Sequence, residues 1–382
     1  MQKITALHYE TMKSVRIDLA DGMIYKMEEL DSHQVGEDLP IVAPGLIDNQ
    51  VNGYAGVDFS GNELTVADIV KATTSLWKTG VTTFVPTLIT NSTANLLRNF
   101  KIFAEAMSHE EVALSVPGFH LEGPWISSKE GFRGCHPTAY ISMPDLDLFQ
   151  NLQAAAGGKI VQVTLAPELP GALSLLDLCA QQGVVTAIGH SDANGSEIRA
   201  ACLHGAKLST HLGNGCANLI HRHDNPIWHQ LAEEQLIPTL IADGHHLLPA
   251  ELKVFMKVKG VERIILTSDI TYLAGMPAGR YRFGGADVIL TSDGRLRSAE
   301  QDCLAGASLP LLIGVENMIR YAGCALSEAI RMASANAAAA FGWKDRGELL
   351  PGRRADLILL ENSNGNLMVK KTILNGKIVF QT

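Results

Sequence analysis

Four side chains that lie far apart in the sequence carry the clearest chemistry of this chain: Glu122, His190, His211 and Asp269. One carboxylate with two imidazoles is a common ligand set for a catalytic zinc ion, and it leaves one coordination position for water. Zinc in such a site makes hydroxide available near neutral pH and polarises a carbonyl group. A free carboxylate beside that water can act as general base and then as general acid, and Asp269 is the candidate for this role.

Each of these residues also has an ordinary structural explanation. Glu122 closes an apolar stretch just before Gly123 and Pro124, where it could cap a helix or form a salt bridge. A single histidine at a strand end is more often a hydrogen-bonded residue than a metal ligand, and Asp269 could cap the segment that follows it. The joint pattern outweighs these separate explanations because all four residues fall at the ends of predicted strands.

The elements that must position these residues are short apolar strands that alternate with helices in the middle of the chain. The eight predicted strands are Leu46–Asn52, Val81–Leu88, Leu114–Glu122, Ile160–Ala166, Val184–His190, Lys207–Leu212, Pro238–Asp243 and Arg263–Asp269. The predicted helices are 64–79, 92–108, 170–182, 192–204, 226–235, 249–258, 308–322 and 326–341. This alternation indicates a parallel sheet covered on both faces. We therefore predict an α/β fold with a (β/α)₈ TIM-like barrel, whose chemistry lies at the carboxyl ends of the strands.

A doubly wound open sheet is the main alternative fold. Such a sheet binds its ligand at a topological switch point, often with a Gly-x-Gly-x-x-Gly turn after the first strand. No turn of that kind follows Leu46–Asn52, which favours the barrel. Residues 276–305 contain Gly284-Gly285 and Ser292-Asp293-Gly294, and we predict a β-hairpin insertion there.

The two ends of the chain have a different, β-rich character. Residues 1–43 alternate apolar and polar side chains, and the C-terminal tail contains Asn375-Gly376 between two apolar runs, a strong signal for a hairpin turn. We predict that residues 1–44 and 345–382 together form a small β-sandwich domain. Residues 45–344 would then form the catalytic barrel domain.

Composition excludes several classes of function. The chain has 382 residues, of which 46% are hydrophobic and 19% charged, as in globular proteins. Its net charge of −9 gives no electrostatic basis for binding nucleic acid, and no apolar run approaches the ~20 residues of a membrane span. The six cysteines lack Cys-x-x-Cys spacing and the first residues lack an apolar signal segment, so we expect a cytoplasmic protein with reduced thiols.

Motifs along nearly the whole chain resemble those of the amidohydrolase superfamily and, within it, the N-acetylglucosamine-6-phosphate deacetylase family. They are Ala43–Gly53, Pro86–Thr90, His120–Trp125, Gly189–Ser191, Thr210–Asn214, Ala242–His246 and Leu304–Leu309. The resemblance implies a hydrolase that converts N-acetylglucosamine 6-phosphate to glucosamine 6-phosphate plus acetate. It also implies a homodimer with one divalent metal ion, Zn²⁺, per subunit. Glu122, His190 and His211 would bind the metal, and Asp269 would activate its water.

The resemblance assigns further roles around the metal. His136 would help to polarise the acetyl carbonyl, and His246 would contact a sugar hydroxyl. Asn214 and Gly215 would contact the phosphate, and Arg222 matches an arginine that is supplied across the dimer interface. The predicted substrate-binding residues are Gln50, Asn214, Gly215, Arg222, His246, Leu304, Ala305, Gly306, Ala307 and Ser308.

Two departures from the family pattern leave alternatives open. Gln50 and Asn52 stand where many superfamily members have His-x-His, and neutral amides are poor zinc ligands, so we predict a single metal. Gln50 would instead hydrogen-bond groups around that metal. The stretch after Asn214 also differs, and Arg222 would suit a carboxylate or another sugar phosphate equally well. The alternatives are a deacylase of another N-acyl sugar or a cyclic amide, and a non-catalytic sugar-phosphate-binding protein.

Overall fold

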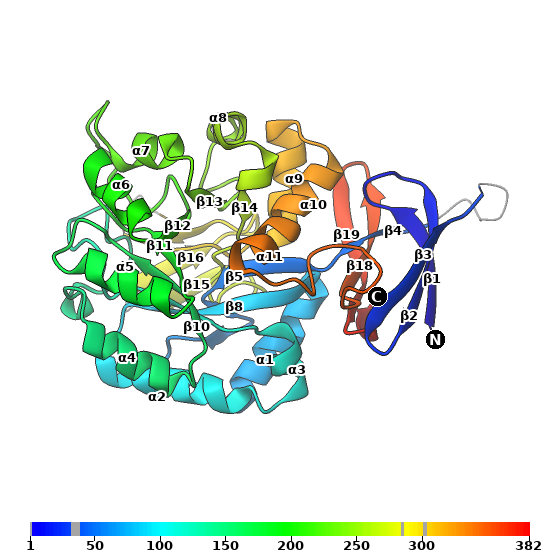
Figure 1. The fold of residues 1–382 in the computed structure, drawn as a ribbon, viewed down its shortest axis with the longest axis horizontal. Coiled ribbons are helices and arrows are strands. Elements are labelled where there is room, and N and C mark those ends of the chain that lie inside the picture. The colour runs from blue at the N-terminus through cyan, green and yellow to red at the C-terminus, as the bar shows by residue number, and fades with distance from the viewer. Residues whose placement is uncertain (1, 32–38, 284–285, 301–303) are drawn as a thin grey trace.

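Eight parallel strands form the central sheet of the protein (Figure 1). The computed structural model describes residues 2–31, 39–283, 286–300 and 304–382. In sheet order the strands are β14 (Ile265–Leu266), β13 (Ile237–Leu240), β12 (Ala206–Ser209), β11 (Val185–Ile188), β10 (Ile160–Leu165), β9 (Phe119–Glu122), β8 (Val81–Ile89) and β5 (Leu46–Val51). A parallel bridge between Val51 and Ile270 brings the two edges together. The predicted (β/α)₈ barrel is therefore confirmed, and the open doubly wound sheet is wrong.

Helices surround this barrel (Figure 1). They are α1 (Val66–Leu76), α2 (Thr93–Ala106), α3 (Glu110–Ser115), α4 (Leu146–Ala155), α5 (Ala172–Gln181), α6 (Gly195–Leu203), α7 (Pro226–Ala232), α8 (Pro249–Lys259), α9 (Leu311–Asn317), α10 (Leu326–Met332) and α11 (Ala335–Phe341). Short 3₁₀ turns lie at Trp77–Thr79, Thr138–Tyr140 and Val261–Arg263, and α9 continues into a π-helical turn at Met318–Ala322. No helix in the described ranges is long and apolar enough to cross a membrane.

Local sequence explains where these helices begin. The hydroxyl of Thr65 accepts a hydrogen bond from the backbone N–H of Asp68, whose carboxylate accepts from the Thr65 N–H in return, and this capping box starts α1. α6 starts in the same way at Asn194 with Glu197. Because these caps satisfy N–H groups that have no partner within the helix, they fix the first turn of each helix after its strand.

The structure differs from the sequence prediction at two places between β8 and β10. The strand predicted from Leu114 starts only at Phe119, because residues 110–115 form α3. The glutamates at 110 and 111 suit the first turn of a helix, and Pro117-Gly118 separates that helix from the strand. The sequence also failed to predict α4, which begins at Leu146 after Asp145, whose side chain caps the N–H of Leu148.

The two ends of the chain form one further sheet of seven strands. Its order is β20 (Lys377–Gln381), β19 (Asn366–Leu374), β18 (Leu357–Ser363), β4 (Ile41–Pro44), β1 (Gln2–His8), β2 (Ser14–Ala20) and β3 (Met23–Glu29). The N-terminal and C-terminal halves meet where β4 pairs with β18. The β-structure predicted for both ends is thus confirmed, with all seven strands in one sheet beside the barrel (Figure 1). A continuous apolar core runs from this sheet into the barrel.

Two small β-elements follow the strand ends that carry the predicted site. β6 (Gly53–Tyr54) pairs with β7 (Val57–Asp58) directly after β5. β15 (Gly279–Phe283), β16 (Ala286–Leu290) and β17 (Leu296–Ser298) form the insertion after β14. The hairpin predicted within 276–305 is confirmed and gains a third strand, although residues 284–285 and 301–303 of that prediction lie outside the described residues.

Candidate active site

Glu122 meets two imidazoles that follow the carboxyl ends of β11 and β12. It is the last residue of β9 and is buried. Its Oε1 lies 3.2 Å from Nε2 of His190 and 3.1 Å from Nε2 of His211. Burial opposes ionisation of Glu122, but hydrogen bonds with both imidazoles outweigh burial and hold the pKa of its carboxyl well below the usual range. The structure therefore brings together the three side chains that were predicted as metal ligands.

His136 joins this cluster from the loop after β9. Its ring centroid lies 4.4 Å from that of His190, and its Nδ1 lies 2.7 Å from Oγ1 of Thr90 at the end of β8. A candidate ligand atom of His136 lies within 4.8 Å of those of Glu122 and His190. Burial, followed by the charge of His190, lowers the pKa of His136 to about 3, so this imidazole is neutral at physiological pH.

The orientation of His190 indicates that a positive charge belongs between it and Glu122. Nδ1 of His190 lies 2.9 Å from the backbone oxygen of Phe132, which can only accept a hydrogen bond, so Nδ1 carries a proton. In the neutral ring, Nε2 then presents a lone pair to the Glu122 carboxylate. Two lone pairs at 3.2 Å repel each other unless a proton or a cation lies between them.

The donor set fits a divalent metal, because Nε2 of His190 and Nε2 of His211 both approach one carboxylate oxygen of Glu122. Among the described residues, the other ring nitrogen of His211, Nδ1, is buried and has no hydrogen-bond partner. Burial acts to lower the pKa of His211, but its contacts with Glu122 and Asp269 prevail and raise it. Carboxylate oxygen and imidazole nitrogen are the ligands that zinc prefers in catalytic sites. The residues present thus suit the metal that the sequence predicted.

Two glycines allow the backbone to approach the imidazoles closely. Gly215 has φ +61°, and a Cβ at this position would lie 2.9 Å from Nδ1 of His190 and 3.1 Å from Cε1 of His211. A Cβ on Gly134, which has φ +54°, would lie 3.0 Å from Cε1 of His190. Any side chain at Gly215 or Gly134 would therefore displace the His190 ring.

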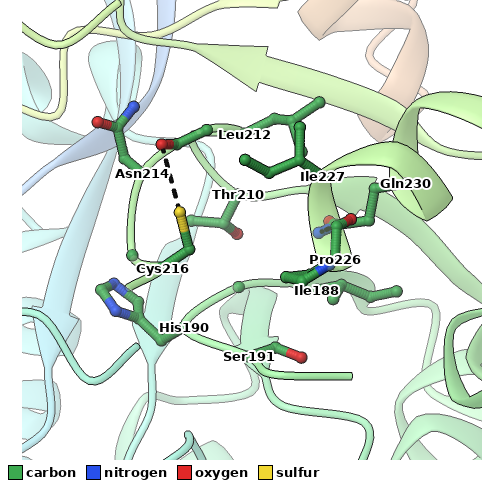
Figure 2. A pocket seen from close by; sticks show the side chains of 13 residues that line it. Ile188, His190, Ser191, Thr210, Leu212, Asn214, Cys216, Pro226, Ile227 and Gln230 are labelled. Carbon is green, nitrogen blue, oxygen red and sulfur yellow. Dashed lines mark hydrogen bonds between the residues drawn. The ribbon is translucent and has the colours of Figure 1, made fainter. Parts of the chain in front are cut away.

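A small cavity lies between His190 and the start of α7 (Figure 2). Its lining includes Asn214, whose side-chain nitrogen is buried without a partner among the described residues, and Cys216, whose Sγ lies 3.6 Å from the Gly213 oxygen. The cavity has a volume of about 10 Å³, which is room for about one water molecule and not for a sugar. A substrate must therefore reach the imidazoles from another side.

Asp269 lies just after β14 and is held by two amides from the end of β5. Its Oδ1 accepts hydrogen bonds from Nε2 of Gln50 at 2.9 Å and from Nδ2 of Asn52 at 2.7 Å. The surrounding protein raises the pKa of Asp269 to about 6, mainly through desolvation, while His211 lowers it and Glu122 raises it. A carboxylate with such a pKa can exchange protons with water near neutral pH.

The backbone is strained at three of these positions. His190, His211 and Asp269 have φ values of 51°, 32° and 52°, in the left-handed region that non-glycine residues rarely adopt. Such conformations cost about 1–3 kcal/mol each and persist only where surrounding contacts enforce them. Their coincidence at three strand ends supports the assignment of this face as the functional one.

The predicted sugar-binding residues lie around the same face. Nδ1 of His246 lies 2.8 Å from Oδ2 of Asp243, whose Oδ1 also accepts from the backbone N–H of His245 and His246. Burial acts to raise the pKa of Asp243, but hydrogen bonds from His246 lower it overall. These contacts fix the ring of His246 and leave its Nε2 turned away from Asp243.

The segment Leu304–Ser308 runs between the loops of His136 and Asp269. The Leu304 oxygen lies 3.9 Å from Sγ of Cys135, and the Ala307 oxygen accepts from the N–H of Thr271. Ser308 donates its hydroxyl to the Gly294 oxygen in the insertion.

Arg222 is different, because it is exposed in the loop before α7 and its guanidinium makes no hydrogen bond or ion pair within the described ranges. The structure therefore leaves Arg222 apart from the cluster.

Sequence reasoning missed several buried polar residues beneath the site. His120 lies between Thr87 and Thr164, with ring nitrogens 3.1 Å and 2.8 Å from their hydroxyls, and burial lowers its pKa to about 4. Thr90 and Asp48 were also assigned no role. The available signal was position: His120 precedes Glu122 by two residues and so shares its face of β9, and Thr90 follows the end of β8.

Comparisons with known proteins agree with this arrangement. A model of the amidohydrolase family matches residues 41–379. The chain is 32% identical to the N-acetylglucosamine-6-phosphate deacetylase of Lysinibacillus sphaericus, over 89% of this chain and 85% of the relative. It is also 32% identical to the N-acetylgalactosamine-6-phosphate deacetylase of Escherichia coli O157:H7, over 95% of this chain and 94% of the relative.

Solved structures give the same result. N-acetylglucosamine-6-phosphate deacetylase from Thermotoga maritima superposes with a TM-score of 0.87 at 28% identity, covering 100% of both chains. A mutant of the Mycobacterium smegmatis enzyme in complex with N-acetyl-D-glucosamine-6-phosphate superposes with a TM-score of 0.88 at 27% identity, covering 99% of this chain and 100% of the other. The resemblance seen in the sequence motifs is thus confirmed, and the chain belongs to the amidohydrolase family.

Proposed function

We propose that the protein is a metal-dependent hydrolase that removes the N-acetyl group of N-acetylglucosamine 6-phosphate, giving glucosamine 6-phosphate and acetate. The observation that carries this proposal is the pairing of the Glu122–imidazole cluster with Asp269, which is anchored by the amides of Gln50 and Asn52. The names of the relatives supply the substrate class.

Glu122, His190 and His211 are the residues that we propose to hold one divalent metal, which we assign as Zn²⁺. When bound, such an ion polarises the amide carbonyl and lowers the pKa of water. His136 also lies within reach of the same position. We assign it instead to the carbonyl oxygen, because Nδ1 can accept from the Thr90 hydroxyl and leave Nε2–H as a donor. That donor would stabilise negative charge on the oxygen during attack.

Asp269 performs both proton transfers in this proposal. Its carboxylate takes a proton from the attacking water and then delivers it to the leaving amine. Oδ1 is occupied by the amides of Gln50 and Asn52, so Oδ2 is the oxygen available for transfer. The raised pKa of Asp269, about 6, lets one group act as base and then as acid near neutral pH.

The remaining assignments concern the sugar and its phosphate. We propose that His246 contacts a sugar hydroxyl and that the backbone of 304–308 lines the sugar. Asn214 and Gly215 would contact the phosphate. Arg222 is exposed and its guanidinium has no partner among the described residues, which suits a role in the site of a second subunit. We therefore propose a homodimer, which light scattering can measure. We also propose that the enzyme is cytoplasmic and that residues 45–344 form its catalytic domain.

The galactose epimer is the second candidate substrate. The relative named for N-acetylgalactosamine 6-phosphate has the same 32% identity and matches 95% of this chain, compared with 89% for the Lysinibacillus relative. The two sugars differ only in the orientation of one hydroxyl. A site that hydrogen-bonds this hydroxyl can discriminate strongly between them.

A deacetylation assay on both epimers, with and without the 6-phosphate, tests the proposed function. We expect turnover of a phosphorylated N-acetylhexosamine and a fall in kcat of about 10²- to 10⁴-fold in Asp269→Asn, with metal content unchanged. Asp147→Asn removes an exposed carboxylate in the first turn of α4 and serves as the matched control. A wild-type protein that holds one metal but cleaves none of these amides would contradict the proposal and favour a sugar-phosphate-binding role.

A further inference from the structure

Side chains add to a single β-bridge in holding the barrel together where β5 meets the chain after β14. β5 pairs with β8 and β14 pairs with β13, whereas within the described chain a single bridge, Val51–Ile270, links the β5 edge to the segment after β14. β14 contains only two residues, Ile265–Leu266. The chain that follows it, which carries Asp269, therefore needs contacts beyond a strand ladder to stay beside β5.

Asp48 supplies those contacts from the middle of β5. Its side chain is 1% exposed. Oδ1 accepts from the Thr267 hydroxyl at 3.0 Å and from the Ser268 N–H at 3.1 Å, and Oδ2 accepts from the Ser268 hydroxyl. Both oxygens of this carboxylate are thus used by the two residues that immediately precede Asp269. Hydrogen bonds to a charged acceptor are stronger than those to a neutral one.

Asp269 needs this support because its backbone is strained. Its φ is 52°, and its N–H donates to the Gln50 oxygen at 3.1 Å. Its carboxylate also depends on β5, through the amides of Gln50 and Asn52. A strained residue keeps its conformation only where its neighbours fix it, and here the neighbours on the N-terminal side are fixed by Asp48.

We propose that Asp48 is a positioning residue for Asp269, which fixes Thr267 and Ser268 against β5 so that the Asp269 carboxylate stays on Gln50 and Asn52. Asp48 transfers no proton in this proposal, because both of its oxygens are occupied by donors. Its effect on turnover rests on the proposed function. Its effect on the backbone of Asp269 is a structural property that can be measured independently.

The test compares Asp48→Asn with wild type in the full chain loaded with Zn²⁺, on the phosphorylated sugar that wild type cleaves. Asparagine keeps the size of the side chain but replaces one acceptor oxygen with an NH₂ donor that clashes with the Ser268 or Thr267 donors. We expect kcat to fall by about 10- to 100-fold, the effect of a misplacement of about 1 Å. KM should change by less than about twofold, and one equivalent of zinc should be retained.

Asp356→Asn is the matched control, because Asp356 is a buried carboxylate that directly precedes β18 in the seven-stranded sheet of the chain ends (the terminal sheet) and pairs with Arg354. Its kcat should match wild type even if its melting temperature falls. An unchanged kcat in Asp48→Asn would overturn the inference, and so would a parallel loss of kcat, substrate binding and zinc. If Asp48→Asn fails to fold, Ser268→Ala removes one donor to Asp48 and should lower kcat in the same selective way; an unchanged kcat there would overturn the inference.

Failure of the proposed function would be visible separately, as a wild-type protein without deacetylase activity. In that case a crystal structure of Asp48→Asn decides the inference. Displacement of the Asp269 carboxylate from Gln50 and Asn52 would support it. An Asp269 that keeps both amide contacts and its left-handed backbone would overturn it.

Discussion

Buried carboxylates are stabilised differently in the terminal sheet and in the region of the barrel that holds Asp48, Glu122 and the imidazoles of His190 and His211. We call this second region the barrel mouth. Directly before β18 of the sheet, Asp356 is buried against Arg354, with Nε of the arginine 2.8 Å from Oδ2. At the barrel mouth, Glu122 and Asp48 are equally buried, yet no Lys or Arg pairs with either of them in the described part of the chain. Burying a charge without a partner is costly, so the two regions must balance charge in different ways.

The difference indicates what the barrel mouth is built to receive. Asp48 is satisfied by hydroxyl and N–H donors, whereas Glu122 faces only imidazoles. Its positive partner must therefore be a proton on a histidine or a bound cation. The terminal sheet carries its own cation, Arg354, and needs no ligand. The barrel mouth combines a carboxylate, imidazole nitrogens and a nearby proton acceptor, which is the combination that metal-assisted hydrolysis requires.

The largest expected effect comes from removing the charge of Glu122. Mutating a residue that only hydrogen-bonds to a metal ligand lowers metal affinity by up to ~100-fold. Glu122→Gln changes a proposed ligand itself, so it should lower metal affinity by more than this, and deacetylase activity should disappear with the metal. Elemental analysis of the purified variant measures this. Glu316→Gln is a suitable control, because Glu316 is also buried but accepts from the N–H of Leu367 in β19 of the terminal sheet. A full equivalent of metal in Glu122→Gln would show that the charge of Glu122 is not balanced by a bound metal, which is the proposed difference between the two regions.

A smaller effect should follow from crowding His190. Gly215→Ala places a methyl group 2.9 Å from Nδ1 of His190, so we expect metal affinity to fall by about 10- to 100-fold. Competition with a chelator gives the affinity. Gly183→Ala is the control for backbone strain alone. Gly183 also has a positive φ, +70°, but nothing lies within 4 Å of the position that a Cβ would take there. Equal metal affinity in the two variants would show that the close approach at Gly215 is unimportant.

The pH dependence of turnover should report on Asp269. The group must be ionised to accept a proton, and its pKa is raised to about 6, so kcat/KM should decline as the pH falls through that value. The decline approaches about tenfold per pH unit. A bound cation can only lower the midpoint, because it favours the carboxylate. A midpoint well above 6, or an acidic limb that persists unchanged in the residual activity of Asp269→Asn, would contradict this role.

The smallest effect on activity is expected in the terminal sheet. Asp356→Asn leaves Arg354 buried without its carboxylate, which should lower the free energy of unfolding by about 3 kcal/mol. Thermal or urea unfolding measures that loss, while kcat should stay at the wild-type value. A change in kcat without a change in stability would mean that the sheet takes part in catalysis.

The sequence predicted the barrel and the meeting of Glu122, His190 and His211 because each of these residues ends an apolar strand, and parallel strands end on the same face. It misassigned residues 114–118, because an apolar run of that length fits a helix as well as a strand. The partners of Asp48 could not be predicted, since its hydrogen bonds cross about 220 positions of sequence. The contact of Gly215 with two imidazoles was equally hidden, because a glycine gives no sign of what approaches it.

We propose that the barrel mouth, unlike the terminal sheet, takes its positive charge from a bound metal. Anomalous diffraction at the zinc edge, from crystals of the zinc-loaded protein, tests it most directly. We predict one peak per subunit, about 2.0–2.2 Å from Glu122, His190 and His211, with Gln50 and Asn52 outside the coordination shell. A barrel mouth without a peak, with Glu122 bonded only to protonated imidazoles, would contradict the claim.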